Sequence, residues 1–416
     1  MKILEVCPDF PPWAGSGAAE TFRLLAQSWH DLGHEVTVVC SRPTARAGAV
    51  PADTPYRVEC YRLIDLPASL HEASYFAPMR WDDRRRFHEL VRREGGEFDR
   101  VIVHGLLETV PRTFLSWSRG ALTSKLVSLQ YGISTAEYSR LLRTASRILH
   151  MTLGRRLVSR MRTIVVFSAE SGSELRKYFG TPKGATVVRR SLGIDAAAFA
   201  SEWAAVAQPP SVLTQRLAGR GIRSPFVFAI GRNHRAKGFD ILLEAFAPLA
   251  REFPDLTLVL AGERTPFTEE LERSIVAHGL EHRVLLLGRV SSPDRMALLA
   301  ACTVFAIPSR KEGFGLNAAH ARILSKPTVA TSTGAHIETL DGEGPFWIVP
   351  PGDAVRLREA LREGLQRPSG VSTIDATQLA RFDIQSVAEG LLRLPEENSG
   401  SDSKLPRTIR PATGAP

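Results

Sequence analysis

The chain has 416 residues, of which 44% are hydrophobic and 23% charged, and its formal net charge is +9. This composition excludes a disordered or fibrous chain, and the length predicts two domains. No apolar run approaches the roughly 18 residues that a membrane-spanning helix needs. The positive charge favours an anionic partner, either a membrane surface or a phosphorylated substrate. Nucleic acid is not expected, because no helix-turn-helix, zinc-finger or RNA-recognition signature occurs.

The cysteines and the N-terminus indicate a reducing compartment. Cys7, Cys40, Cys60 and Cys302 form no Cys-x-x-Cys pair and mostly lie in apolar runs, as free buried thiols do. The N-terminal MKILEVCP is too short and too quickly polar for a signal peptide. We therefore expect a cytoplasmic protein, free or peripheral at the inner face of the cell membrane.

In the first half of the chain, short apolar runs alternate with amphipathic stretches, which is typical of a doubly wound parallel sheet. Strands are predicted at 3–7, 36–40, 101–104, 126–129 and 164–167. The first strand leads through the loop PPWAGSG into a helix over 18–32, which ends at Gly33. The last leads through Ser168 into a helix that contains Leu175 and Tyr178.

The second half repeats this alternation from about Pro225. Strands are predicted at 226–230, 256–260, 284–287 and 304–307, and helices at 239–249 and 316–324. We therefore predict an α/β protein with domains at 1–192 and 223–379, joined by a connection at 193–222 that is rich in Ala, Pro and Gln. A C-terminal helix is predicted within 380–395. Residues 396–416 have almost no apolar side chains and are predicted to be disordered.

The most informative segment is 305–338. An apolar run ends at Pro308 and Ser309, a loop with Glu312 and Gly315 follows, and then a helix begins. A helix N-terminus behind a glycine loop leaves backbone N–H groups free to bind an anion. Glu312 beside them can accept hydrogen bonds from the hydroxyls of a polyol phosphate. The alternative is a tight turn without a ligand.

A second loop, GRNHRAKG, follows the first strand of the second half. Arg232 and Lys237 lie five positions apart there, and two cations at the end of a parallel strand suit a pyrophosphate. The loop lacks the Gly-Lys-Ser/Thr of a Walker motif. The alternative is two solvated charges.

Together these segments resemble the donor-site motifs of the retaining glycosyltransferases of family 4, which have the GT-B fold. The matching residues are Gly231, Arg232, Lys237, Gly238, Pro308, Ser309, Glu312, Gly313, Phe314, Gly315, Leu316, Pro327, Val329 and Ala330. The resemblance spans about residues 3–394 and implies two Rossmann-like domains that face each other across a cleft. The helix within 380–395 would pack back onto the first domain.

The resemblance implies a hexosyltransferase that retains the anomeric configuration, with a nucleotide-sugar donor on the second domain and a glycan, lipid-linked or small acceptor on the first. Arg232, Lys237 and Glu312 would be catalytic. The donor-binding residues would be Gly15, Gly17, Gly231, Arg289, Val290, Gly313, Phe314, Gly315, Leu316 and His320, with Ser16 and Gln130 facing the acceptor and the sugar. No Asp-x-Asp occurs, and neither a metal nor another cofactor is expected.

Two positions depart from the family pattern. His320 stands where the family has a glutamate that holds the ribose, so the nucleotide would bind more weakly or differently. Gln130 or Tyr131 stands where the family has a histidine, and His104 is read as a hydrogen-bonded residue at a strand end rather than a substrate ligand. These departures keep two alternatives open: a non-catalytic nucleotide-sugar-binding or scaffold subunit, and a sugar-nucleotide epimerase of the same fold.

A basic segment lies between the predicted strands of the first half. Between Arg140 and Arg162 there are seven arginines and no acid, and Leu141, Leu142, Ala145, Ile148 and Leu149 recur at helical spacing. A basic amphipathic helix can lie on an anionic membrane surface. The alternative is a core-packed helix with a solvated basic face.

Overall fold

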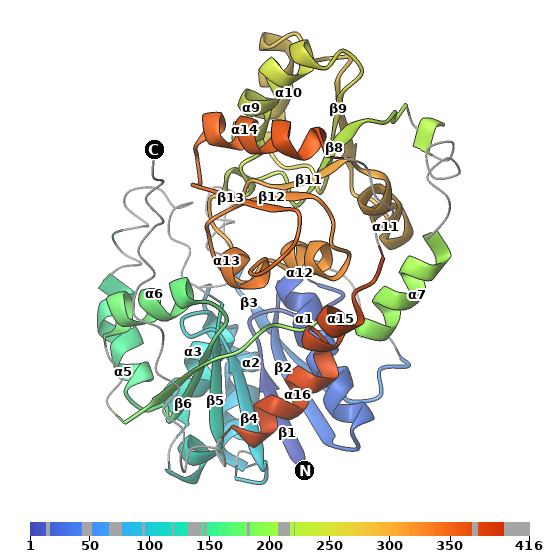
Figure 1. The fold of residues 1–416 in the computed structure, drawn as a ribbon. Coiled ribbons are helices and arrows are strands. Elements are labelled where there is room, and N and C mark those ends of the chain that lie inside the picture. The colour runs from blue at the N-terminus through green and yellow to red at the C-terminus, as the bar shows by residue number, and fades with distance from the viewer. Residues whose placement is uncertain are drawn as a thin grey trace.

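The computed structural model describes residues 1–13, 17–43, 52–65, 77–93, 96–118, 120–131, 144, 148–180, 184–206, 217–219, 221–367 and 373–394. In these residues two parallel sheets, each covered by helices, form two layered domains placed one above the other (Figure 1). No helix in this described part of the chain is long and apolar enough to span a bilayer.

The first sheet has the strand order β3-β2-β1-β4-β5-β6-β7, and its neighbouring strands pair in parallel. Its strands are β1 (Lys2–Val6), β2 (Glu35–Pro43), β3 (Arg57–Leu63), β4 (Arg100–His104), β5 (Leu126–Gln130), β6 (Thr163–Val166) and β7 (Thr186–Arg189). The covering helices are α1 (Gly17–Asp31), α2 (Trp81–Arg93), α3 (Thr109–Trp117), α5 (Arg155–Val158) and α6 (Ala169–Phe179), with a 3₁₀ turn at Gly120–Lys125 and a π turn at His150–Gly154. The central strands β1, β4 and β5 are rich in apolar residues because both of their faces are buried, and they also carry the buried polar residues Glu5, His104 and Ser128.

The second sheet has the order β10-β9-β8-β11-β12-β13, also parallel. Its strands are β8 (Phe226–Ile230), β9 (Thr257–Ala261), β10 (Val284–Gly288), β11 (Val304–Ile307), β12 (Thr328–Thr331) and β13 (Phe346–Val349). Its helices are α9 (Phe239–Glu252), α10 (Phe267–Ala277), α11 (Ser292–Ala301), α12 (Leu316–Ile323), α13 (His336–Thr339) and α14 (Ala354–Leu365), with a 3₁₀ turn at Arg235–Lys237.

Every predicted strand is present, with bounds that differ from the predicted ones by at most three residues. Strands β3, β7 and β13 were not predicted, because they lie at sheet edges, are only partly buried and lack a strong apolar pattern. The short buried strand β12 was also not predicted, and its residues entered only as part of a motif. These two parallel sheets are the GT-B architecture that the resemblance implied.

Two segments cross between the domains. The predicted connection at 193–222 contains α7 (Ala196–Val206), which packs against α11. The helix predicted over 380–394 is present but not continuous, because the chain breaks between α15 (Ala376–Arg381) and α16 (Ile384–Arg393). Asp383 caps the second helix by accepting from the Gln385 N–H, and Phe382 is buried between the two helices.

The returning chain is held to the first domain at both ends of α16. Ile384 N–H donates to the Ile194 carbonyl at 2.9 Å, so the two crossings pair with each other. Further along, Trp29 Nε1–H of α1 donates to the Ala388 carbonyl at 3.0 Å, and Arg100 donates to the Leu392 carbonyl at 2.9 Å. The predicted tail at 396–416 lies outside the described residues.

Candidate functional site

The glycine loop of residues 308–315 joins β11 to α12 in the second domain. Gly315 has φ 88° and no side chain caps α12, which leaves its first N–H groups open to a ligand. A Cβ on Gly315 would lie 2.7 Å from the His336 ring, and a Cβ on Gly313 would lie 2.5 Å from the Tyr131 carbonyl oxygen of the first domain. The loop therefore needs glycine at both positions, and it lies where the two domains meet.

Lys237 and Glu312 form an ion pair beside this loop. Lys237 Nζ donates to Glu312 Oε2 at 2.6 Å, and the Ser309 hydroxyl donates to the same oxygen at 3.2 Å. Burial alone would raise the pKa of Glu312, but the Lys237 ammonium and these hydrogen bonds outweigh it and hold the pKa below its usual value. Glu312 is therefore an ionised acceptor at neutral pH.

Arg232 lies on the same loop as Lys237, directly after β8. A Cβ on Gly231 would touch the Lys237 stem at 3.3 Å, so the loop folds tightly over that side chain. Arg232 is exposed, and no residue in the described ranges pairs with its guanidinium. The structure thus brings Lys237 and Glu312 together and leaves Arg232 available on the adjoining loop.

His336 is a residue of this site that the sequence analysis did not name. It is fully buried, and its Nδ1 lies 2.9 Å from the Thr331 carbonyl oxygen. Its Nε2 points at Gly315 and has no hydrogen-bond partner in the described part of the chain, which is rare for a buried nitrogen. Its place after β12, next to β11 in the sheet, was the available signal, since ligands bind at the carboxyl ends of parallel strands.

A second contact that the sequence analysis missed joins the two domains. Glu170 of α6 accepts hydrogen bonds from Lys311 Nζ at 3.0 Å, from the Thr333 hydroxyl at 3.3 Å and from the Gly334 N–H. Glu174, one turn along α6, also contacts Lys311. Two glutamates of the first domain thus contact loops next to Glu312. Such pairs between distant segments leave no local pattern in a sequence.

His320 does not lie next to the Lys237–Glu312 pair. Its ring stacks on Phe199 of α7, with centroids 5.1 Å apart, and its Nδ1 lies 3.3 Å from Arg295 Nη1. Burial, reinforced by the Arg295 charge, lowers the pKa of His320 to about 3, so the ring is neutral. Because an arginine can only donate, Nδ1 accepts and Nε2 carries the proton. His320 lines a cavity of about 430 Å³ between α1, α7, α11 and α12, together with Arg23, Glu202 and Leu316.

The other predicted donor-binding residues are spread along the same edge of the second domain. Arg289 is exposed and pairs with Glu263 at 3.3 Å, while Val290 packs against the core. Phe314 is buried, with its ring against Phe382 at 6.3 Å. Leu316 begins α12 and faces the start of α1, because a Cβ on Gly17 would lie 3.6 Å from it. The predicted residues Gly15 and Ser16 fall outside the described residues.

Gln130 is turned toward its own strand. It is buried, and its Nε2 donates to the Ser128 hydroxyl at 2.8 Å. The neighbouring Tyr131 hydroxyl lies 2.8 Å from His104 Nδ1, and His104 Nε2 lies 2.7 Å from Glu5 Oε1. His104 is thus a fully buried strand-end histidine with both nitrogens bonded, as the sequence analysis favoured.

The groups that could hold a ligand are cations, backbone N–H groups and hydroxyl acceptors. Arg232, Lys237 and the start of α12 suit a diphosphate, and Glu312 suits sugar hydroxyls. In the part of the chain that the structure describes, no three His, Cys, Asp or Glu residues are grouped as metal ligands.

Comparisons with known proteins agree with this arrangement. Residues 15–198 match the model of "Glycosyltransferase Family 4" and residues 224–367 that of "Glycosyl transferases group 1". The chain is 30% identical over 266 residues to the lipopolysaccharide core biosynthesis mannosyltransferase LpsB of Rhizobium meliloti, covering 61% of this chain and 70% of that protein. It is 29% identical over 231 residues to the mannosyltransferase LpcC of Rhizobium leguminosarum, covering 54% of this chain and 60% of LpcC.

Solved structures share the fold at lower identity. Anabaena HepE in complex with UDP and glucose is similar with a TM-score of 0.63, at 20% identity over 95% of both chains. Sucrose-phosphate synthase from Thermosynechococcus elongatus is similar with a TM-score of 0.71, at 17% identity over 95% of this chain and 98% of that one.

Proposed function

Because the chain belongs to the group 1, family 4 glycosyltransferases, we propose that it transfers a hexose from a nucleotide-sugar donor to an acceptor hydroxyl. The observation that carries the proposal is the 2.6 Å pair between Lys237 and Glu312, next to the open start of α12 and the exposed Arg232. Its relatives named as mannosyltransferases support a hexosyl donor, and the UDP-bound neighbour supports a nucleoside diphosphate as the leaving group.

In this proposal the diphosphate binds the second domain. Negative charge grows on its oxygen as the bond to the sugar C1 breaks, and fixed positive groups lower that barrier. Arg232, Lys237 and the first N–H groups of α12 supply those charges without a metal ion. Glu312 accepts hydrogen bonds from the sugar hydroxyls and orients the ring. Loss of one such donor typically costs about 3–4 kcal/mol of transition-state stabilisation.

We propose that transfer retains the anomeric configuration. The acceptor oxygen bonds to C1 on the face that the diphosphate leaves, and the acceptor proton passes to a donor phosphate oxygen. This step needs no protein base, which is consistent with Gln130 in place of a histidine and with its amide bonded to Ser128.

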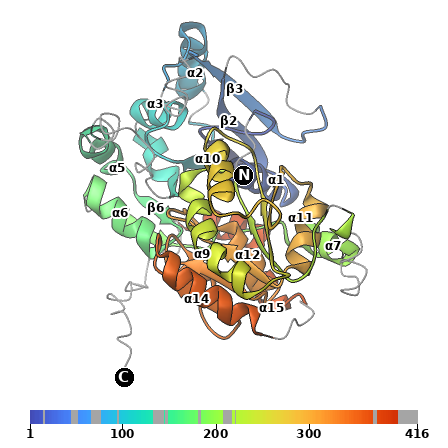
Figure 2. The same ribbon diagram turned by 90° about the horizontal axis from the view of Figure 1, so that it is seen from above.

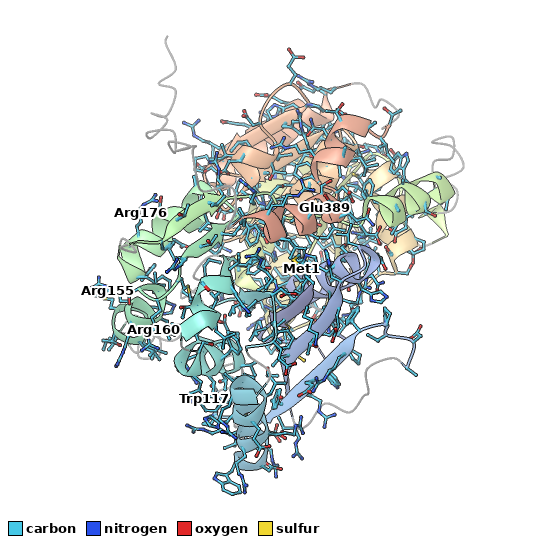
Figure 3. The ribbon with its side chains drawn as sticks, turned by 90° about the horizontal axis from the view of Figure 1, so that it is seen from below. Met1, Trp117, Arg155, Arg160, Arg176 and Glu389 are labelled. Atoms are coloured by element: carbon cyan, nitrogen blue, oxygen red, sulfur yellow. The ribbon has the colours of Figure 1, made fainter. Side chains whose placement is uncertain are left out.

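The acceptor would lie on the first domain and be a glycan or a lipid-linked sugar, in a cytoplasmic enzyme that is peripheral at the inner face of the membrane. The lipopolysaccharide core relatives support this class. Of the predicted basic segment, Arg155, Arg156, Arg160 and Arg162 are exposed and Met151 is about half exposed, while Leu157 and Val158 are buried. Arg155 and Arg160 point outward from one side of the first domain (Figure 3). Arg140, Arg143 and Arg147 fall outside the described residues.

The test begins with binding. Thermal stabilisation by UDP, GDP and ADP is measured with and without a chelator, for the wild type and for Arg232→Ala/Lys237→Ala. The proposal expects a shift with one nucleotide, insensitive to the chelator and lost in the double variant, and then sugar transfer with that donor. Absence of any shift would favour the scaffold alternative. Conversion of the donor sugar without an acceptor would favour an epimerase.

A further inference from the structure

Helix α2 carries a stripe of exposed side chains that plays no part in the donor site. The stripe consists of Trp81, Arg84, Arg85 and His88, at positions i, i+3, i+4 and i+7, which lie along one side of a helix. Trp81 is 72% exposed, whereas Phe87 and Leu90 on the other side are buried in the core. One side of the helix therefore packs into the core, and the opposite side exposes an aromatic and basic surface. Seen from above, it lies well apart from α12 and α14 of the second domain (Figure 2).

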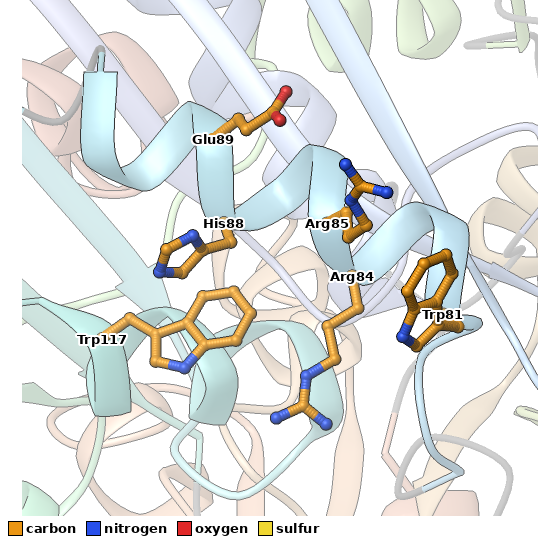
Figure 4. A pocket seen from close by; sticks show the side chains of 6 residues that line it. All are labelled: Trp81, Arg84, Arg85, His88, Glu89 and Trp117. Atoms are coloured by element: carbon orange, nitrogen blue, oxygen red, sulfur yellow. The ribbon is translucent and has the colours of Figure 1, made fainter.

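The stripe forms one wall of a pocket of about 380 Å³ (Figure 4). The other residues that line this pocket are Glu89 of the same helix and Trp117 of α3. Arg84 extends between the two indoles, with its guanidinium carbon 5.7 Å from the Trp117 ring centroid. The guanidinium carbon of Arg85 lies 5.3 Å from the Trp81 ring centroid. Guanidinium groups held over aromatic faces keep their N–H edges free to bind an anion in a defined plane.

The charges of α2 are divided between its two sides. The acids of the first turn point toward β3, where Arg62 pairs with Asp82 at 2.6 Å and with Asp83 at 2.8 Å. Within the described ranges no carboxylate pairs with Arg84 or Arg85. Among its described lining residues, the pocket therefore presents two guanidinium groups without a carboxylate partner and one acid, Glu89.

We propose that this pocket binds an anionic oligosaccharide, a chain whose sugar rings carry carboxylate or phosphate groups. The indole faces offer flat surfaces for the C–H faces of pyranose rings, and the guanidinium forks fit carboxylate or phosphate oxygens. A lipid surface fits less well, because Trp117 is only partly exposed and the acid Glu89 also lines the pocket. The site would hold a glycan chain outside the transfer cleft. This inference rests on the proposed function only in one respect, which is that the bound glycan would be an acceptor or product of the transfer reaction.

The test measures binding to the full-length protein without any donor, by titration calorimetry. The probes are oligogalacturonate, a malto-oligosaccharide of the same length, inorganic phosphate, and vesicles of phosphatidylglycerol. The variants are Arg84→Gln/Arg85→Gln and Trp81→Ala. The matched control is Arg273→Gln/Arg356→Gln, which removes two exposed arginines from α10 and α14 of the second domain. Circular dichroism checks the fold of each protein.

We expect the wild type and the control to bind oligogalacturonate. The arginine double variant should bind it at least about tenfold more weakly because charged hydrogen bonds are lost, and Trp81→Ala should bind it more weakly because a stacking surface is lost. The malto-oligosaccharide and phosphate alone should bind more weakly than the charged chain. Equal binding by all proteins, or equal affinity for the neutral chain, would overturn the proposal. Loss of vesicle binding alone in the pocket variants would assign the surface to lipid. Thermal stabilisation by the nucleotide should be unchanged in every variant. A negative result for the α2 pocket would therefore not count against the proposed donor site.

Discussion

The ammonium group of Lys237 lies 2.6 Å from Oε2 of Glu312, and this contact joins the first loop of the second domain to its glycine loop. The two residues are 75 positions apart in the chain, yet they meet because β8 and β11 are neighbours in the sheet and both loops leave from the carboxyl ends of those strands. In the proposed mechanism this pair would hold a cation for the leaving diphosphate and a carboxylate for the sugar in one place before a ligand binds. Such preorganisation strengthens electrostatic stabilisation of a transition state.

We predict that Lys237→Met moves the acid limb of the transfer rate to higher pH. Burial raises the pKa of Glu312 and Lys237 lowers it, so removal of the ammonium raises that pKa and Glu312 becomes protonated at higher pH. The variant should also lose roughly 10²–10³-fold in kcat/KM, as expected for loss of one charged donor. The measurement is the pH profile of kcat/KM. The control is Arg235→Met. It removes an exposed cation that lies on the same loop as Lys237 and pairs with Glu270 of α10. An unchanged acid limb in Lys237→Met would contradict the coupling.

We predict that Gly315→Ala destabilises the protein more than Gly33→Ala does. Both glycines have positive φ, 88° and 82°, so both substitutions carry about 1–2 kcal/mol of left-handed strain. Only Gly315 also has the His336 ring at 2.7 Å from the added Cβ, whereas nothing lies within 4 Å at Gly33. Overpacking adds about 1–3 kcal/mol.

Denaturant unfolding of both variants tests this difference. The double variant Gly315→Ala/His336→Ala should lose less stability than the sum of the two single losses, since the two residues share one contact. Equal losses for Gly315→Ala and Gly33→Ala would show that the ring does not constrain the loop.

We predict that His320 makes folding stability depend on pH. Its folded-state pKa of about 3 lies below its ordinary value of 6.5, so the unfolded chain binds a proton that the folded protein does not. The contribution of neutral His320 to the free energy of unfolding is therefore complete above pH 6.5. It is lost as the pH falls from there toward 3, by up to about 1.4 kcal/mol per pH unit. Unfolding free energies of the wild type should decline more steeply over this range than those of His320→Gln. His278→Gln, at an exposed position, should keep the wild-type slope.

We predict that the Glu170 carboxylate protects the Gly334 amide from hydrogen exchange. That N–H donates to Glu170 across the domain interface, and Lys311 Nζ lies 3.0 Å from the same carboxylate. In Glu170→Ala the amide should exchange faster, by roughly tenfold or more if about 1.5–3 kcal/mol of charged hydrogen bonding is lost. Glu389→Ala, which removes an exposed acid from α16, should leave that exchange rate unchanged. Unchanged exchange in Glu170→Ala would mean that the two domains do not stay in this contact in solution.

The local features of the donor loops were predictable from the sequence. Glu312, Gly315 and Lys237 lie in motifs of strand, glycine loop and helix start, and each motif is a few residues long. The helix within 380–394 was placed correctly but not its break, because the apolar spacing continues through Phe382 while Asp383 starts a new helix. Edge strands such as β3 were missed because they are only half buried and mix charged with apolar residues.

The sequence alone determined that this is a two-domain α/β protein with a loop that carries two cations and a glycine loop before a helix, because strand periodicity, glycine positions and cation spacing are local properties of the chain. Tertiary structure decided which side chains meet. Only the fold brings Glu170 to Gly334, His336 to Gly315 and His320 to Phe199. Each of these contacts joins separate elements, two of them across 121 and 164 positions of the chain. Their geometry depends on how the sheets and helices pack, and no short pattern of residues records that packing.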